Sequence, residues 1–302
     1  NARHAVAIDE LRHTFTPTLW TNIAQKRKKA VKQVWFPGVH SDVGGGYAVS
    51  GLSDGTLEWM MDEAGALGLK FRQGARGQLQ PDSRSLLHNS ASGVFAQLKL
   101  RPRNVPAFKK NSADFHRSAI DRHSNPPLNE GAYWPSKYLR KNESITLDIF
   151  ARERWNATGL YLEAGTKYAF TARGQWLDSD IKCGPAGSGD GKFELKEVFH
   201  IASSGLGKLE NLFSKISGNE KADFWWTKRV EDFPWFALVG VIANGAGADA
   251  NGIPIDHETF VIGDGVEYAP RQGGGYLFCF ANDAWHAYDN NKGSVSLTVK
   301  HL

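Results

Sequence analysis

The sequence predicts an α/β part followed by an all-β part, and two patterns carry this prediction. Residues 31–67 hold a short apolar run, a glycine-rich loop and a stretch with apolar residues at helical spacing, which is typical of an α/β unit. From about residue 142 onward, short apolar runs alternate with Gly, Asn and Asp, which is typical of an antiparallel β-sandwich. We therefore expect one domain over residues 1–141 and a second over residues 142–302.

The apolar run Val34-Trp35-Phe36 predicts a buried strand that ends at Pro37-Gly38, and His40 and Asp42 follow directly. A loop between a strand and a helix is where an α/β enzyme presents a catalytic histidine. The alternative is a buried, hydrogen-bonded histidine with no catalytic role, and the local pattern leaves both interpretations open. Asp42 orients His40 or shapes the loop, and Asp9 is a second candidate for the orienting acid.

Three helices are expected in the first 141 residues. HAVAIDELRHTF (residues 4–15) predicts a helix that ends before Pro17, and FHRSAIDRH (115–123) predicts a short helix or turn inside an irregular cap. Between them, Ser53 or Asp54 is expected to cap a helix that ends near Gly65, with apolar positions at helical spacing: Leu57, Met60, Met61, Ala64 and Leu67.

The same helix start contains a match to the nucleophile motif G-x-S-x-G, Gly51-Leu52-Ser53-Asp54-Gly55. No buried strand precedes Ser53, and it follows His40, whereas the nucleophile of an α/β hydrolase precedes its histidine. We therefore favour Ser53 as part of a helix cap and expect the nucleophile to lie outside this chain.

Composition sets broad limits on function. The chain has 302 residues, 41% of them hydrophobic, and a formal charge of +4 from 36 basic and 32 acidic residues. That small excess gives no reason to expect a nucleic-acid partner. Cys183 and Cys279 are too few and too far apart for a metal motif or a disulfide framework, and a single bridge stays open.

VKQVWFPGVHSDVGGGY (31–47), followed by LSDGTLEWMMDEAGALGL (52–69) and preceded by ARHAVAIDELRHTFTPTLW (2–20), resembles the closing segment of a bacterial α/β-hydrolase family. That family includes type VI secretion phospholipase effectors. The resemblance implies lipid ester hydrolysis by Ser-His-Asp chemistry with His40 as general base, in a bacterial protein that is secreted or delivered into a target cell. It also implies a partner: the N-terminal half of the hydrolase, with its serine, in the same precursor or in a separate chain.

The loop FANDAWHAYDNNKGSVSLTV (280–299) places four side-chain oxygen donors close together: Asp283, Asp289, Asn290 and Asn291. Clustered hard oxygen donors suit Ca²⁺, although Asn-rich loops are also ordinary turns.

This loop, with ITLDIFARERWNATGLYLEAGTKYAFTARGQW (145–176) and FALVGVIANGA (236–246), resembles the PA-I galactophilic lectin family, calcium-dependent galactose-binding β-sandwiches. The resemblance implies a jelly-roll-like sandwich, a galactose-type glycan as partner, and a set of Ca²⁺ ligands. These are the side chains of Asp283, Asn290 and Asn291 and backbone carbonyls of Ala287 and of a residue near Asp178. Asp283 and Asn290 would also contact sugar, and Trp285 and His286 would stack on the sugar or block it.

Residues 184–234 interrupt the strand pattern and are expected to form an insertion. The sequence thus predicts the C-terminal portion of an α/β-hydrolase domain followed by a lectin-like sandwich, acting on lipid or membrane. Two alternatives stay open: a non-catalytic calcium-dependent lectin on a hydrolase-derived scaffold, and a structural toxin component that assembles with another chain.

Overall fold

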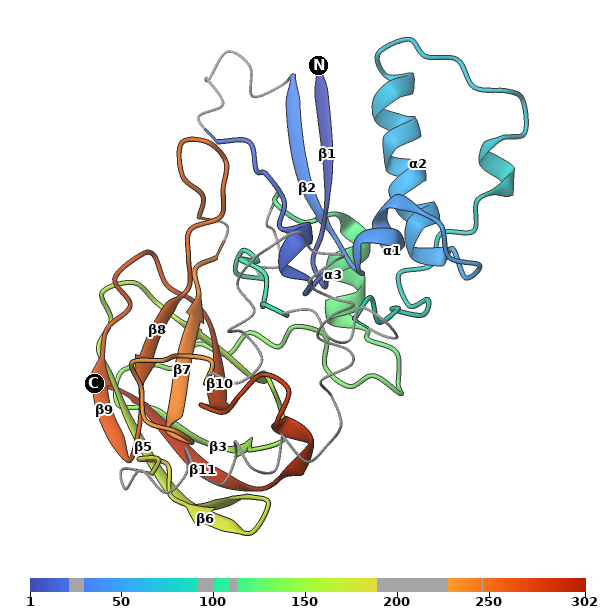
Figure 1. Ribbon diagram of the computed structural model, residues 1–302. Helices are drawn as coiled ribbons and strands as arrows, with labels where there is room; N and C mark the ends of the chain where they lie inside the picture. Colours follow the sequence, from blue (N-terminus) through green and yellow to red (C-terminus); the bar gives the residue numbers. More distant parts are fainter. Residues whose placement is uncertain (22–29, 92–99, 109–112, 189–227, 246) are drawn as a thin grey trace.

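Figure 1 shows the computed structural model, which describes residues 1–21, 30–91, 100–108, 113–188, 228–245 and 247–302. The chain forms two parts, an N-terminal part from β1 through α3 and a sandwich from β3 through β11. Within the described residues, no helix has the length and apolar character that crossing a membrane requires.

The N-terminal part contains a two-stranded parallel sheet of β1 (Ala2–Ala7) and β2 (Val31–Phe36). The predicted strand at Val34–Phe36 is confirmed, but the predicted helix over residues 4–15 is wrong. Its first half is β1, and only His13–Phe15 forms a 3₁₀ turn. Short apolar runs suit helix and strand alike, and here pairing with β2, which buries Val6 beside Trp35, decides for the strand.

Helices follow β2 and lie beside the parallel pair. They are α1 (His40–Gly44), α2 (Gly51–Gly65) and α3 (Arg117–Ser124), with a 3₁₀ turn at Arg76–Gln78. The predictions of α3 and of the end of α2 at Gly65 are confirmed. The start of α2 was placed too late: Ser50 is its N-cap, and Ser53 lies inside the first turn, where its Oγ donates to the carbonyl of Ser50.

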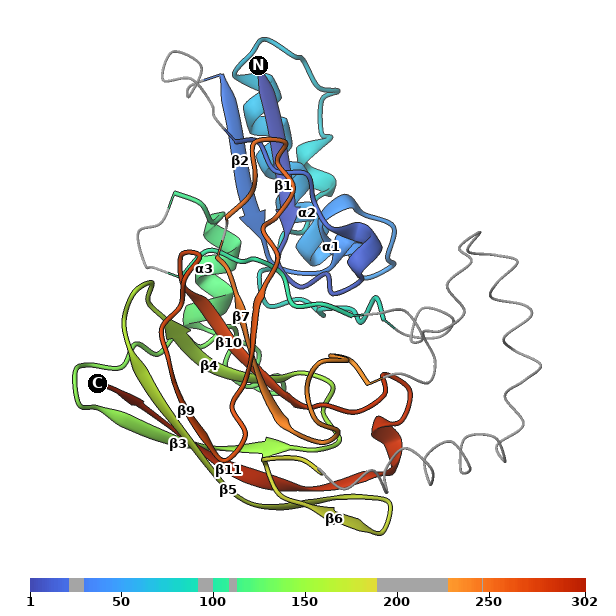
Figure 2. The same cartoon turned by 60° about the vertical axis from the view of Figure 1, so that its left-hand side comes forward.

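The sandwich consists of antiparallel strands, as predicted. One sheet has the order β4-β10-β7-β8 and the other β3-β11-β5-β6, with β9 paired to β5. Figure 2 shows the second sheet lying beneath the first. The bounds are β3 Ser144–Phe150, β4 Asn156–Leu162, β5 Tyr168–Asp178, β6 Ile181–Cys183, β7 Leu238–Ala243, β8 Glu258–Val261, β9 Gly265–Tyr268, β10 Gly275–Ala281 and β11 Asn291–His301.

Alternate residues of the two sheets face each other and form the main core, which includes Trp176, Phe170, Leu277 and Val295. Cys183 and Cys279 are both buried in it. Most of the predicted insertion, residues 189–227, lies outside the described residues.

Trp134 joins the two parts. Its ring packs against the core of the N-terminal part and against the outer face of the β10 sheet, where it lies edge-on to Tyr276 at 5.2 Å between ring centroids. The phenol oxygen of Tyr276 accepts from the backbone N–H of Phe108 at 3.0 Å. The connection between β7 and β8 reaches the N-terminal part on another side, where Leu19 N–H donates to the carbonyl of Gly252 at 2.7 Å (Figures 1 and 2).

Candidate functional site

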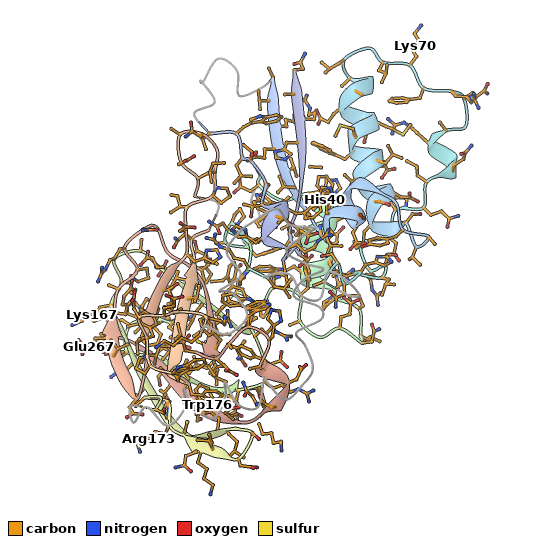
Figure 3. All side chains as sticks on the ribbon, in the orientation of Figure 1. His40, Lys70, Lys167, Arg173, Trp176 and Glu267 are labelled. Carbon is orange, nitrogen blue, oxygen red and sulfur yellow. The ribbon has the colours of Figure 1, made fainter. Side chains whose placement is uncertain are left out.

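The carboxyl ends of β1 and β2 meet at one edge, because the strands are parallel, and the candidate catalytic residues lie there. His40 is the first residue of α1, and Figure 3 labels it where the parallel pair ends. Its ring is exposed and lies edge-on to Phe15 at 5.0 Å between centroids. Its backbone N–H donates to Oε2 of Glu10 at 3.2 Å. This arrangement holds the backbone of His40 and leaves the imidazole facing outward.

Asp42 is buried, and it forms hydrogen bonds with nearby segments of the same chain rather than with the ring of His40. Its Oδ2 accepts from the backbone N–H groups of Val39 at 3.0 Å and His88 at 3.1 Å, and its Oδ1 lies 2.6 Å from Nδ1 of His88. In the described part of the chain, no hydrogen bond joins Asp42 to the His40 ring. Residues two apart on a helix point to different sides. Of the two predicted roles for Asp42, this geometry matches shaping the loop.

His88 is the residue that sequence reasoning missed. Its ring stacks on Tyr47 with 3.8 Å between centroids, so both the plane and the edge of the imidazole are fixed. It lies in an irregular stretch without periodicity, and no local signal connects it with Asp42.

Asp9 binds the same loop from the other side. Its carboxylate accepts from the backbone N–H of Gly38 at 2.7 Å, from the Tyr133 hydroxyl at 2.8 Å and from Trp134 Nε1 at 2.8 Å. Burial raises the pKa of Asp9, against the lowering effect of these three hydrogen bonds. Asp9 thus connects the turn before His40 with the segment that packs on the sandwich.

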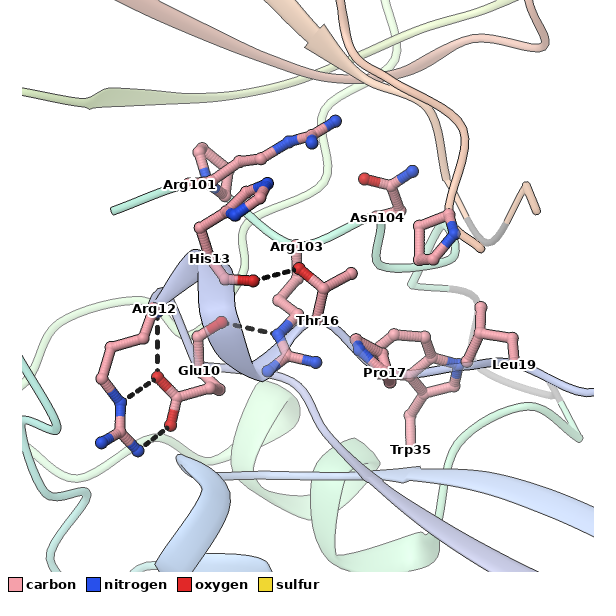
Figure 4. Close-up of a pocket in the computed structure, with 12 residues that line it drawn as sticks. Glu10, Arg12, His13, Thr16, Pro17, Leu19, Trp35, Arg101, Arg103 and Asn104 are labelled. Carbon is pink, nitrogen blue, oxygen red and sulfur yellow. Dashed lines mark hydrogen bonds and ion pairs between the residues drawn. The ribbon is translucent and has the colours of Figure 1, made fainter. Parts of the chain in front are cut away.

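Glu10 anchors the His40 backbone, and Figure 4 shows its pair with Arg12. Its carboxylate forms a bidentate pair with Arg12 and accepts from the Ser90 hydroxyl. Burial alone would raise the pKa of Glu10, but the hydrogen bonds from Arg12, Ser90 and the His40 backbone outweigh it and hold the pKa at about 2. The pocket drawn in Figure 4 has a volume of about 20 Å³, room for one water molecule, so this corner is an anchor rather than a ligand site.

The predicted calcium ligands come together at the start of β11, of which Asn291 is the first residue. Asn290 Nδ2 donates to Asp178 Oδ1 at 2.7 Å, and Asn291 Nδ2 donates to Asp283 Oδ2 at 2.8 Å. Asp178, Asp283 and Asn291 are all buried. The side chain of Asp178, of which only a nearby backbone carbonyl was expected, is thus part of the cluster, because Asp178 lies opposite Asn291 in the β5–β11 register.

One buried polar atom of this cluster lacks a hydrogen-bond partner among the described residues. Asn291 Oδ1 is buried and has no hydrogen-bond partner within the described residues. A buried amide oxygen beside two carboxylates fits a Ca²⁺ ligand set, since a cation would satisfy it. The described residues hold no group of three or more His, Cys, Asp or Glu side chains suited to a metal; the present cluster has two carboxylates and would rely on amide and backbone oxygens.

Trp285 and His286 are not exposed as aromatic rings that stack on a sugar would be. Trp285 is only 5% exposed, and the guanidinium groups of Arg154 and Arg229 lie 5.8 and 4.9 Å from its ring centroid. His286 is half-buried, and burial, with a smaller effect of Arg154, lowers its pKa to about 4. Ala287 occupies the turn before Tyr288–Asn290, the 3₁₀ turn that leads into β11.

Comparison with known proteins finds a family match for the N-terminal segment. Residues 1–63 match the family model of the type VI secretion (T6SS) phospholipase effector Tle1-like catalytic domain. This Tle1-like segment contains β1, β2, His40 and Asp42 and most of α2. The match confirms the resemblance drawn from the sequence for these residues.

Two further similarities are more limited. An uncharacterized protein of Saccharomyces cerevisiae is 52% identical over 46 residues, which are 14% of this chain and 7% of the yeast protein. The chain therefore spans only a small fraction of that relative. Among solved structures, the EclA N-terminal domain, described as a PllA-like lectin, is similar with a TM-score of 0.30 and 15% identity, over 53% of this chain and 95% of that one.

Proposed function

We propose that this chain carries the histidine-bearing part of a lipid ester hydrolase, joined to a calcium-dependent module that binds a glycan or a membrane surface. The observation that carries the proposal is the Tle1-like segment, which places His40 at the carboxyl edge of its parallel strands. A secreted or delivered bacterial effector is the setting that this family match supports.

In the proposed reaction, His40 is the general base. Its imidazole accepts the proton of a serine hydroxyl as the serine attacks the ester carbonyl, and then donates that proton to the leaving alcohol. Exposure of the ring at the strand edge allows such contact, and the backbone hydrogen bonds that Glu10 and Asp42 accept hold the turn that carries it. Ser53 is not that nucleophile, because it lies inside α2 with its hydroxyl bonded to the helix backbone.

We propose that the serine, the orienting acid and further strands belong to a segment that adds to β1. Among the described residues, β1 pairs with β2 alone, and two strands do not make a stable sheet by themselves. Side chains on and after α2 also remain exposed, with Leu57 at 48% and Leu67 at 54%. The occupant is the other half of the hydrolase domain, as a preceding region of the same polypeptide or as a second chain.

For the sandwich, we propose that Asp178, Asp283, Asn290 and Asn291 with the Ala287 carbonyl hold Ca²⁺. A bound ion would supply a positive centre on which two hydroxyl groups of a sugar can bind. The residues of the chain would have separate roles: the carboxylates would balance the charge of the ion, and the unpartnered Oδ1 of Asn291 would be an additional ligand. Galactose-type glycans follow from the lectin resemblance; the buried Trp285 favours a site without aromatic stacking.

The proposal is tested by a fluorophosphonate serine probe combined with intact mass measurement under native and denaturing conditions. We expect the label on a serine outside residues 1–302, in a polypeptide or region that copurifies with them, and loss of labelling in His40→Ala. Label on Ser53 would overturn the assignment. A protein that takes no label but is retained on a galactose matrix in Ca²⁺ would favour the non-catalytic lectin.

A further inference from the structure

A pocket of about 250 Å³ lies between the two parts of the chain. Leu87 and Trp134 line it from the N-terminal part, and Ala157, Tyr276 and Phe278 line it from the outer face of the β10 sheet. These walls are apolar, and the volume lies slightly below the roughly 300–1,000 Å³ of ordinary small-molecule pockets. The space therefore suits a segment of one alkyl chain rather than a whole lipid or an oligosaccharide.

The pocket borders the His40 turn. Asp9, which lines it, accepts a hydrogen bond from the backbone N–H of Gly38, two residues before His40. Leu87, on the same wall, directly precedes His88, the partner of Asp42. The Gly38 end of the candidate catalytic turn is thus anchored by a residue of the pocket wall, and the Asp42 end by His88, the sequence neighbour of a wall residue.

The polar side chains at this pocket are already engaged. The Asp9 carboxylate accepts from Gly38, Tyr133 and Trp134, and the Thr158 hydroxyl donates to the carbonyl of Leu277. The carboxylate of Glu130, which also lines the pocket, is paired with the guanidinium of Arg122. Sugar hydroxyls or a charged headgroup would find their partners taken, whereas methylene groups need none. The chemistry of the lining favours an alkyl chain.

The walls are also fixed before any ligand binds. Trp134 is bonded through Nε1 to Asp9 and packs edge-on to Tyr276, whose hydroxyl oxygen is held by Ser136 and by the Phe108 backbone N–H. Such preorganisation lowers the entropic cost of binding a flexible chain.

We propose that this pocket holds a segment of the acyl chain of the ester substrate, so that the sandwich forms one wall of the substrate site. This inference rests on the proposed ester hydrolysis. It gives the sandwich a second role: Phe278 and Tyr276 select chain length while the loop between β10 and β11 binds the surface.

The first experiment measures binding without catalysis. Alkyl alcohols of increasing length with a terminal bromine should quench the fluorescence of Trp134, and the loss of quenching in Trp134→Phe assigns the signal. Each methylene buried should raise affinity by roughly fourfold until the pocket is full, after which affinity should level off. Alcohols serve better than fatty acids, since the Asp9 carboxyl lies in the wall.

The second experiment changes the volume of the pocket. Ala157 is exposed and lies opposite Phe278 in the β4–β10 register, so Ala157→Trp should fill the space with little effect on folding. We expect it to abolish the length dependence, and Phe278→Ala to extend it to longer chains. Ala164→Trp, at an exposed position in the turn after β4, is the matched control and should leave the length dependence unchanged.

The third experiment measures hydrolysis of esters of graded chain length by the assembled enzyme. Ala157→Trp should move the preferred chain to shorter lengths through KM. Hydrolysis with an unchanged length profile, or no quenching that depends on Trp134, would overturn the pocket assignment. Quenching that follows chain length in a protein without hydrolysis would keep an alkyl-binding pocket and reject the hydrolase.

Discussion

The carboxylate of Asp42 holds the imidazole of His88, with Oδ1 2.6 Å from Nδ1 and Oδ2 accepting the His88 backbone N–H. The pair attaches the segment around His88 to the turn that begins α1. Since Asp42 is bound there, the proposed mechanism needs a different acid to orient His40.

Replacing Asp42 should loosen this turn. Asp42→Ala removes the acceptor of three hydrogen bonds, two of them from buried or half-buried backbone N–H groups. Hydrogen bonds to a charged group contribute roughly 1.5–3 kcal/mol each, and because the contributions of neighbouring bonds are not additive, we expect unfolding free energy to fall by at least about 3 kcal/mol in urea titrations. Asp62→Ala, which removes an exposed ion pair with Arg76, is the control and should cost less than about 1 kcal/mol. Equal losses in the two variants would contradict the structural role of Asp42.

Gly38 should tolerate no side chain. Its φ is +107°, and a Cβ there would lie 2.3 Å from the Cβ of Asp42. Gly46 also has a positive φ, +121°, but open space around it. Gly46→Ala should therefore cost only backbone strain, about 1–3 kcal/mol, and Gly38→Ala distinctly more. Thermal unfolding of both variants checks this, and a smaller loss for Gly38→Ala would show that the turn is not packed against Asp42.

The carboxylate of Asp283 should control Ca²⁺ affinity. Asp283→Asn takes one full charge from the proposed ligand set, and we expect calorimetry to show binding weakened by more than about tenfold. Asp289→Asn changes the same charge at an exposed neighbour and should leave affinity within about twofold. Added Ca²⁺ should raise the melting temperature of the parent protein but not of Asp283→Asn. If Ca²⁺ changes the melting temperature of neither protein, the proposal that the sandwich binds Ca²⁺ is wrong.

Acid should destabilise the fold in two stages. Burial, followed by nearby arginine charge, lowers the pKa of His257 and His286 to about 4. The unfolded chain then takes up protons that the folded chain does not, so stability falls as pH decreases from about 6.5 to 4. Glu10, with its pKa held at about 2, contributes stability above about pH 4.5 that is lost as pH falls toward 2, on the order of 3 kcal/mol.

Denaturant unfolding across this pH range measures both stages. His257→Gln should flatten the upper stage and Glu10→Gln the lower one, whereas the exposed His13→Gln should change neither. A stability profile that is level from pH 6.5 to 4 in the parent protein would contradict the buried, neutral state of these histidines.

Local sequence pattern predicted some elements and failed at others for physical reasons. The apolar run at Val34–Phe36 and the alternating apolar residues of the sandwich are patterns typical of strands that bury one or both faces of a sheet. The structure forms strands at both places. The error over residues 4–15 arose because Ala5, Val6 and Ile8 suit either period, and only pairing with a strand about 29 residues later decides between them.

The sites show the same limit. Asn290 and Asn291 are adjacent in sequence, and the pattern drew attention to both. The partner of Asn290 is Asp178, 112 residues away, and the partner of Asp42 is His88, 46 residues away. Such pairings depend on the strand register and on the path of an irregular segment, neither of which is encoded in local periodicity.

The role of His40 as the general base of an ester hydrolase is tested most directly by phospholipid hydrolysis with the assembled enzyme carrying His40→Ala. We expect the rate to fall by about 10²–10⁴-fold, with unfolding free energy unchanged, because the ring is exposed. His13→Ala, another exposed histidine of the N-terminal part, should keep full activity. Undiminished hydrolysis by His40→Ala would show that His40 is not the general base.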